Sequence, residues 1–125
     1  MIKQIQSKEI KEYIKNNPKC VLLDVRTKEE WAEGKPDGDK IGLKTYFLSL
    51  FFQGRIVNEN FIKEFKNLNI KQDYQILSLC GSGSRSQRAA ELLKEEGYEC
   101  LNISDGFLGD NIEKIGWKNN QLPIK

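Results

Sequence analysis

The sequence predicts an α/β fold with a mainly parallel sheet, and its alternating patterns carry that prediction. Short apolar runs rich in β-branched residues alternate with segments whose apolar residues recur at helical spacing. Strands that alternate with helices in this way pair in parallel through right-handed crossovers. The 125 residues contain no internal repeat, low-complexity segment or linker, so a single domain over residues 1–125 is expected.

The first third of the chain is predicted to hold a helix, a strand and a second helix. Ser7 is placed to cap the first helix, which ends before Pro18. The continuous apolar run Cys20–Val25 is typical of a strand buried on both faces. Thr27–Glu30 has the form of a capping box and opens a short helix that ends at Gly34.

The middle of the chain is predicted to add a turn at residues 35–40 and a strand within Ile41–Leu48. The apolar run continues to Phe52, which leaves the end of that strand undefined. Asn58 is placed to cap a helix, and Gln75–Leu79 is predicted to be a short buried strand. One face of the helix carries Phe61, Ile62, Phe65 and Leu68.

The last third is predicted to hold a helix, a strand and a final helical segment. The helix buries Ala89, Leu92 and Leu93. Gly97 stands where a C-cap glycine belongs, and Cys100–Ile103 follows as a strand. Ile112 and Ile115 mark the final helical segment.

The composition limits which binding partners and which cellular compartment are expected for this protein. Hydrophobic residues make up 38% and charged residues 30%, which is typical of a globular domain. A formal net charge of +2, from 20 Lys+Arg and 18 Asp+Glu, indicates no concentrated basic face, so nucleic acid is not expected as a partner. No apolar stretch has the length of a signal peptide or a membrane span. We therefore expect a cytoplasmic protein without a membrane partner.

The cysteines and the lack of histidine narrow the chemistry further. Three cysteines without close pairing argue against a disulfide framework, and the absence of CxxC spacing argues against zinc. The chain has no histidine, which excludes Cys–His, Ser–His and His–metal sites. We expect no metal and no cofactor. Cys20 and Cys100 fall in apolar strand patterns and are predicted to be core residues.

Cys80 is the candidate nucleophile, because it stands where a buried strand ends and a helix begins. Sites in open α/β sheets form outside the carboxyl ends of the strands. The next four residues, Gly81, Ser82, Gly83 and Ser84, are small enough for their amides to surround an anion. The helix dipole and Arg85 add positive potential, which favours a thiolate. The same pattern is compatible with a tight turn around an unreactive buried cysteine.

The spacing of the loop separates it from two phosphate-binding designs. A nucleotide P-loop requires Lys and then Ser or Thr after its last glycine, whereas Gly83 is followed by Ser84 and Arg85. The cysteine phosphatases place five residues between Cys and Arg, and this chain has four. The smaller ring favours a single sulfur atom over a phosphoryl group on the cysteine.

Three segments in order resemble the rhodanese family of sulfurtransferases. They are residues 22–31, with an apolar strand ending in Asp-Val-Arg; residues 80–86, with the cysteine loop; and the glycine-aromatic pairs at 106–107 and 116–117. The resemblance implies a rhodanese-like three-layer sandwich, with a mainly parallel central sheet of about five strands and helices on both faces. It departs from the family at residues 34–38, where members commonly carry Gly-His-x-Pro-Gly-Ala.

The resemblance also implies an activity. Cys80 would take a sulfane sulfur from thiosulfate or a persulfide donor and pass it, as a cysteine persulfide, to a thiol or protein acceptor. Arg85 would hold the loop or contact the oxyanion of the donor. The substrate-binding residues would be Gly81, Ser82, Gly83, Ser84 and Arg85. The residues supporting the site would be Asp24, Arg26 and Ser86.

Two further points stay open at this stage. The aromatic segment between residues 40 and 58 is longer than a minimal domain needs. It either lines the mouth of the site, offers a surface to the acceptor, or adds a strand and core packing. The alternative functions are a rhodanese-fold phosphatase or arsenate reductase-like enzyme, and a non-catalytic rhodanese-like binding module.

Overall fold

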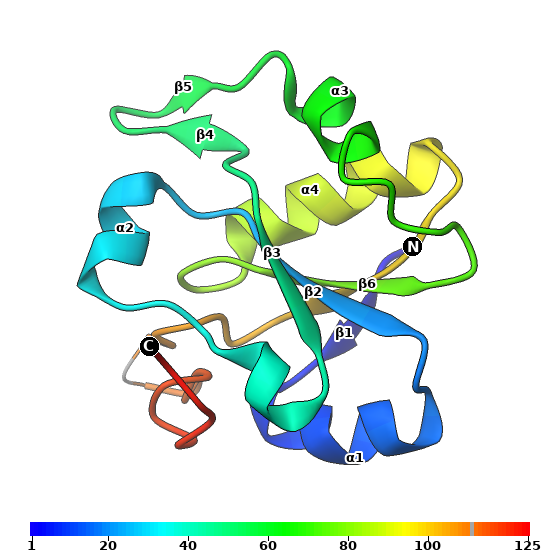
Figure 1. The fold of residues 1–125 in the computed structure, drawn as a ribbon. Helices are drawn as coiled ribbons and strands as arrows, with labels where there is room; N and C mark the ends of the chain where they lie inside the picture. The colour runs from blue at the N-terminus through cyan, green and yellow to red at the C-terminus, as the bar shows by residue number, and fades with distance from the viewer. Residues whose placement is uncertain (111) are drawn as a thin grey trace.

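The computed structural model describes residues 1–110 and 112–125 and confirms the predicted α/β fold (Figure 1). Five strands form one parallel sheet in the order β1-β7-β6-β2-β3. The strands are β1 (Lys3–Ile5), β2 (Cys20–Asp24), β3 (Lys44–Phe47), β6 (Gln75–Leu79) and β7 (Glu99–Ile103). A separate antiparallel hairpin joins β4 (Phe51–Phe52) to β5 (Ile56–Val57).

Helical elements cover both faces of the sheet. They are η1 (Ser7–Glu9), α1 (Ile10–Asn16), α2 (Lys28–Glu33), η2 (Gly38–Ile41), α3 (Phe61–Lys66) and α4 (Ser84–Glu95). Alternate strand residues point to opposite faces, so Leu23 packs with α3 and α4, while Leu22 packs with α1 and the C-terminal segment. The long helix α4 crosses behind the sheet (Figure 1). No described helix is long and apolar enough to cross a bilayer.

Several predicted helix ends and strands are confirmed. The Thr27 side chain accepts from the Glu30 amide and Glu30 bonds back to the Thr27 amide, which is the predicted capping box. Gly97 follows the end of α4 with φ of +94°, a conformation that favours glycine. The buried strands β2, β6 and β7 fall within one residue of their predicted bounds.

The N-terminal prediction is wrong in two respects. Strand β1 was not anticipated, because it pairs on one side only and buries only Ile5 of its three residues. Ser7 does not cap the first helix, since Gln6 holds that position. Instead, the Ser7 amide and hydroxyl donate to the two oxygens of Asp105, at 2.9 and 2.6 Å.

The middle and C-terminal predictions also need correction. The strand predicted within Ile41–Leu48 is confirmed as β3, whereas Ile41 belongs to η2 and the apolar run to Phe52 enters the hairpin. Asn58 does not cap α3: its side-chain Oδ1 accepts from the backbone amide of Asn60, which is the N-cap.

The predicted final helix is absent among residues 112–125, and residue 111 lies outside the described residues. Ile112 and Ile115 are exposed there, whereas the fully buried Trp117 packs on the sheet.

Asp105 is predicted to be essential for joining the two ends of the chain. It accepts from Ser7 and from the Gly116 amide, at 2.9 Å, and its side chain is buried. Asp105→Ala is expected to lower the free energy of unfolding by at least about 2 kcal/mol, because unpaired buried donors cost ~1–3 kcal/mol each. Urea unfolding measures the change.

The matched control is Asp73→Ala, which removes an exposed carboxylate paired with Lys19. Surface ion pairs contribute little, so its urea midpoint should stay close to that of the wild type. Equal midpoints for the Asp105 and Asp73 variants would contradict the role given to Asp105.

Candidate functional site

Cys80 occupies the turn between β6 and α4, in the middle of the sheet. Strand β6 has β2 on one side and β7 on the other, so the cysteine leaves the sheet at its carboxyl edge. Its side chain is fully buried. The Gly83 amide donates to Sγ at 3.1 Å, and the Ser86 hydroxyl lies 3.2 Å from the same sulfur. The sulfur therefore sits at the N-terminal, electropositive end of α4.

The turn after β7 holds the cysteine loop in place. The amides of Phe107 and Leu108 donate to the carbonyl oxygens of Cys80 and Gly81, at 2.8 and 3.0 Å. Gly106 has φ of +66°, and a side chain there would collide with the Gly81 carbonyl. This backbone contact is possible only because the residue is glycine.

Arg85 is engaged by a carboxylate that sequence reasoning did not identify. Its guanidinium forms two hydrogen bonds to Glu30, at 2.6 and 3.0 Å, and both side chains are partly buried. Burial raises the pKa of Glu30, but hydrogen bonds from Arg85 and the Thr27 amide outweigh it and lower the pKa to about 2. The capping box was visible in the sequence, but nothing local linked Glu30 to Arg85, 55 residues away.

Asp24 and Arg26 form a buried ion pair at the end of β2. The guanidinium donates to both carboxylate oxygens, at 3.0 to 3.1 Å, and one nitrogen also reaches the Gly34 carbonyl at 2.9 Å. It lies 4.1 Å from the ring centroid of Phe107. Burial raises the pKa of Asp24, and Arg26 opposes that rise. The pair thus links β2, the end of α2 and the turn after β7.

Ser86 bridges Cys80 to a second residue that the sequence did not single out. The Ser86 hydroxyl lies 2.5 Å from Oδ1 of Asn102 on β7. Asn102 is almost fully buried, and the only local signal for it was a polar residue inside an otherwise apolar strand. Of the remaining loop residues, Gly81 and Gly83 are buried, whereas Ser82 and Ser84 are exposed.

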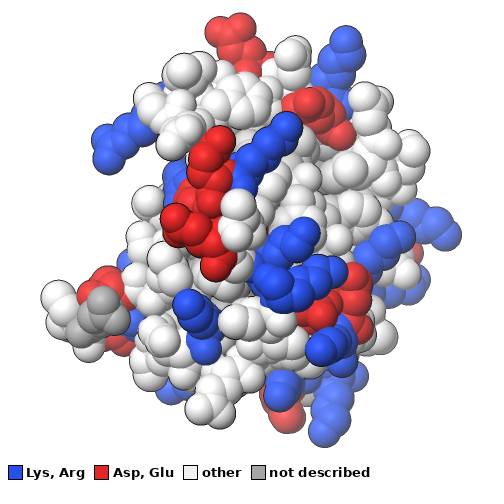
Figure 2. Space-filling model, turned by 60° about the vertical axis from the view of Figure 1, so that its left-hand side comes forward, with Lys and Arg blue, Asp and Glu red and all other residues white. Residues whose placement is uncertain are grey.

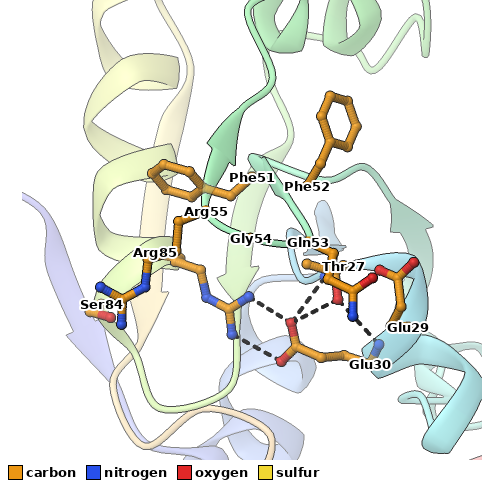
Figure 3. A pocket seen from close by; sticks show the side chains of 10 residues that line it. All are labelled: Thr27, Glu29, Glu30, Phe51, Phe52, Gln53, Gly54, Arg55, Ser84 and Arg85. Carbon is orange, nitrogen blue, oxygen red and sulfur yellow. Dashed lines mark hydrogen bonds and ion pairs between the residues drawn. The ribbon is translucent and has the colours of Figure 1, made fainter.

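The aromatic hairpin forms one wall of a cavity of about 660 Å³ beside the cysteine loop (Figure 3). Figure 3 shows the Arg85–Glu30 pair beneath the hairpin, with Phe51 and Phe52 on either side above it. The segment therefore does line the space next to the loop. The lining residues are Thr27, Glu29, Glu30, Phe51, Phe52, Gln53, Gly54, Arg55, Ser84 and Arg85.

Charge is mixed over the surface seen in Figure 2. On this face a group of acidic side chains lies beside a group of basic side chains, and neither sign covers the whole face. A large charged partner would therefore meet charges of both signs here. Among the described residues, no group of His, Cys, Asp or Glu is arranged to hold a metal ion.

The other two cysteines are chemically distinct from Cys80. Cys20 and Cys100 lie at the amino-terminal ends of β2 and β7, at the opposite edge of the parallel sheet. Burial raises the pKa of Cys20 to about 11 and that of Cys100 to about 12. Both thiols therefore stay protonated at neutral pH.

Comparisons with known proteins agree with this fold. The family described as "Rhodanese-like domain" matches residues 6–111. The uncharacterized protein RP600 of Rickettsia prowazekii is 46% identical over 110 residues, covering 86% of this chain and 84% of that protein. A protein named sulfurtransferase from Allochromatium vinosum is 25% identical over 125 residues, 99% of this chain and 95% of that protein.

A solved structure gives the same result. The crystal structure of Rv0390 from M. tuberculosis has a TM-score of 0.82 and 31% identity, covering 98% of this chain and 96% of that one. The family match over most of the chain and the shared fold lead to one conclusion: the chain belongs to the rhodanese-like domain family.

Proposed function

We propose that the protein is a sulfurtransferase that carries a sulfane sulfur as a persulfide on Cys80. The main support is the Gly83 amide, which donates to Sγ at the positive end of α4. A donor and a helix dipole aimed at the sulfur stabilise negative charge on it. Family membership and the relative named sulfurtransferase favour the same chemistry.

The proposed reaction has two displacement steps. The Cys80 thiolate attacks the outer sulfur of thiosulfate, a new S–S bond forms, and sulfite leaves with the electron pair of the broken S–S bond. An acceptor thiolate then attacks the outer sulfur of the persulfide, and the Cys80 thiolate leaves. Neither step requires a general base at the bond that breaks, which suits a chain without histidine.

The role of Arg85 in the proposed reaction is limited by its ion pair. Two of its N–H groups are occupied by Glu30, so the guanidinium is fixed beside the loop and its charge is balanced. The remaining N–H groups are donors available to the oxyanion of a donor. The pair therefore holds the loop, and contact with the donor would be an additional role.

Phosphatase or arsenate reductase chemistry is the alternative enzyme function. It is disfavoured by the four-residue spacing between Cys80 and Arg85 and by the balanced charge of Arg85. A phosphate dianion is better bound by an uncompensated guanidinium. A non-catalytic binding module is disfavoured because the nucleophile and the surrounding donors are all present.

The persulfide is the test that separates these functions. Wild-type protein treated with thiosulfate and desalted should gain the mass of one sulfur atom, removable by a thiol. Cys80→Ser should gain nothing, because a serine hydroxyl does not ionise at neutral pH and forms no persulfide. Intact-mass spectrometry under non-reducing conditions is the measurement.

Cys20→Ser is the matched control, because it removes a buried thiol at the opposite edge of the sheet. It should load sulfur like the wild type. Hydrolysis of an artificial aryl phosphate by the wild type, with no mass gain from thiosulfate, would support the phosphatase instead.

The Glu30–Arg85 pair predicts a pH-dependent contribution to stability. The folded-state pKa of Glu30, about 2, lies below its ordinary value of 4.5. Ionised Glu30 therefore stabilises the fold fully above pH 4.5, and this contribution is lost as the pH falls toward 2. Denaturant unfolding of wild type and Glu30→Gln should differ most above pH 4.5 and converge at lower pH.

Glu29→Gln changes the neighbouring carboxylate, which forms no ion pair with any residue that the structure describes, and serves as the control. A Glu30→Gln effect that stayed constant across the acidic range would be inconsistent with an ionised pair.

Substitution of an apolar residue on the β4–β5 hairpin is expected to affect only the transfer of sulfur to the acceptor. Phe52 lines the cavity, and we expect Phe52→Ser to slow discharge of the persulfide by an organic thiol about fivefold, as for a loss of roughly 1 kcal/mol. Loading from thiosulfate should be unchanged, because that donor has no apolar part. Ile56→Ser is the control, since Ile56 is exposed on the same hairpin but does not line the cavity. Equal slowing of both steps would assign the hairpin a structural role only.

A further inference from the structure

A chain of buried polar side chains runs beneath the cysteine loop. The Cys80 sulfur contacts the Ser86 hydroxyl at 3.2 Å, and that hydroxyl lies 2.5 Å from Asn102 Oδ1. The Asn102 amide nitrogen donates to the Gly83 carbonyl at 3.1 Å and to Gln4 Oε1 at 2.8 Å. Cys80 and Ser86 are fully buried and Asn102 is 3% exposed, so water does not take over these contacts.

The orientation of the Asn102 amide follows from its partners. The Gly83 carbonyl can only accept a hydrogen bond, so it must face the nitrogen of Asn102. Gln4 agrees, because its own nitrogen donates to the Ile2 carbonyl and leaves its oxygen for Asn102. The oxygen of Asn102 therefore faces Ser86.

The number of protons available on Ser86 then decides the direction of the hydrogen bond between Ser86 and Cys80. Asn102 Oδ1 only accepts, so the single hydroxyl proton of Ser86 lies between these two oxygens. Ser86 has no second proton to give to Cys80. Their contact must be a bond donated by the Cys80 thiol, so this arrangement holds the protonated form of the cysteine.

We propose that Ser86 and Asn102 form a hydroxyl switch that responds to the charge on Cys80. When Cys80 is a thiol, Ser86 donates to Asn102. When Cys80 ionises, its proton passes to solvent water, and the Ser86 hydroxyl rotates about its Cβ–Oγ bond to donate to Sγ. Asn102 is thus a positioning residue that acts through Ser86. It opposes the ionisation of Cys80, because it competes with the cysteine sulfur for the hydroxyl proton of Ser86.

The switch would matter at two points of the proposed reaction, on which its functional meaning rests. Cys80 carries negative charge before it attacks the donor and again when it leaves the persulfide. In both states the Gly83 amide and the rotated Ser86 hydroxyl would donate to the sulfur together. When Cys80 is protonated, the hydroxyl returns to Asn102.

The charged groups that surround the loop come from several elements. They are Arg85 on α4, Glu29 and Glu30 on α2, the Asp24–Arg26 pair at the end of β2, Arg55 between β4 and β5, Asp105 after β7, and Lys114, whose Nζ donates to the Ser82 carbonyl. Substitutions at Ser86 and Asn102 leave all of them in place. A difference in ionisation between such variants therefore reports on the polar chain rather than on these charges.

The test is a pH titration of the thiolate by its ultraviolet absorbance, which requires no access of a reagent to the buried sulfur. Each variant is measured against the same variant carrying Cys80→Ser, which cancels the other cysteines. Asn102→Leu removes the competitor for the Ser86 proton, and its midpoint should move to lower pH. Ser86→Ala removes the donor, and its midpoint should move to higher pH. Each shift should reach about half a pH unit, a threefold change in the ionisation constant.

Two further variants separate the switch from a structural effect. Ser86→Thr keeps a hydroxyl and should titrate close to the wild type. Ser78→Ala is the matched control, because the buried Ser78 hydroxyl donates to the Ser86 carbonyl at 3.0 Å and not to the sulfur. It should lower the urea midpoint without moving the titration.

Opposite shifts for Asn102→Leu and Ser86→Ala would support the switch, and shifts in the same direction would overturn it. If Asn102→Leu fails to fold, the Ser86→Ala variant decides by itself: a titration midpoint equal to that of the wild type would overturn the switch. Since the titration uses no sulfur donor, wild-type protein that forms no persulfide would count against the proposed function and not against the switch.

Discussion

The buried Arg26 guanidinium is the contact on which the loops at the carboxyl edge of the sheet depend. It is 2% exposed, pairs with Asp24, reaches the Gly34 carbonyl and packs on the ring of Phe107. Phe107 in turn donates its amide to the Cys80 carbonyl. Loss of one partner of such a pair leaves an uncompensated buried charge, which costs about 3–5 kcal/mol. The backbone position of the cysteine is therefore tied, through one aromatic residue, to a charge pair on the neighbouring strand.

The N–H group that donates directly to the Cys80 sulfur belongs to the backbone. Arg85 is matched by Glu30 and Lys114 donates to the Ser82 carbonyl, whereas the Gly83 amide at the end of α4 points at the sulfur itself. Amide donors act at short range and with fixed direction, which suits one sulfur atom inside a small ring. A dianionic phosphoryl group spreads its charge over three oxygens and gains more from a full, uncompensated charge. The balance of charges thus favours the proposed sulfur chemistry independently of loop length.

Local patterns in the sequence were sufficient for four of the five strands of the sheet and for the position of the loop, but not for contacts between distant segments. The runs around Cys20 and Gln75 are continuous and apolar, and the small residues after Cys80 leave few alternatives. Ser7 has the form of a cap, yet it bonds to Asp105, 98 residues away. Glu30 completes the capping box at the start of α2 and also pairs with Arg85. Only the capping box can be recognised from the sequence, because it depends on neighbouring residues. Strand β1 escaped prediction because one buried side chain in three residues produces no alternation.

The cysteine loop and the hairpin have different structural support, and this difference separates chemistry from recognition. The loop is held between β6, α4 and the turn after β7, where even a methyl group at Gly106 would collide with it. The hairpin has two residues in each strand and leaves Phe52, Ile56 and Val57 about half exposed. A two-stranded hairpin of this size has little stability of its own. In the proposed reaction the hairpin would adapt to an acceptor while the Arg85–Glu30 pair beneath it stays in place, so the geometry at the sulfur would not depend on the identity of that acceptor.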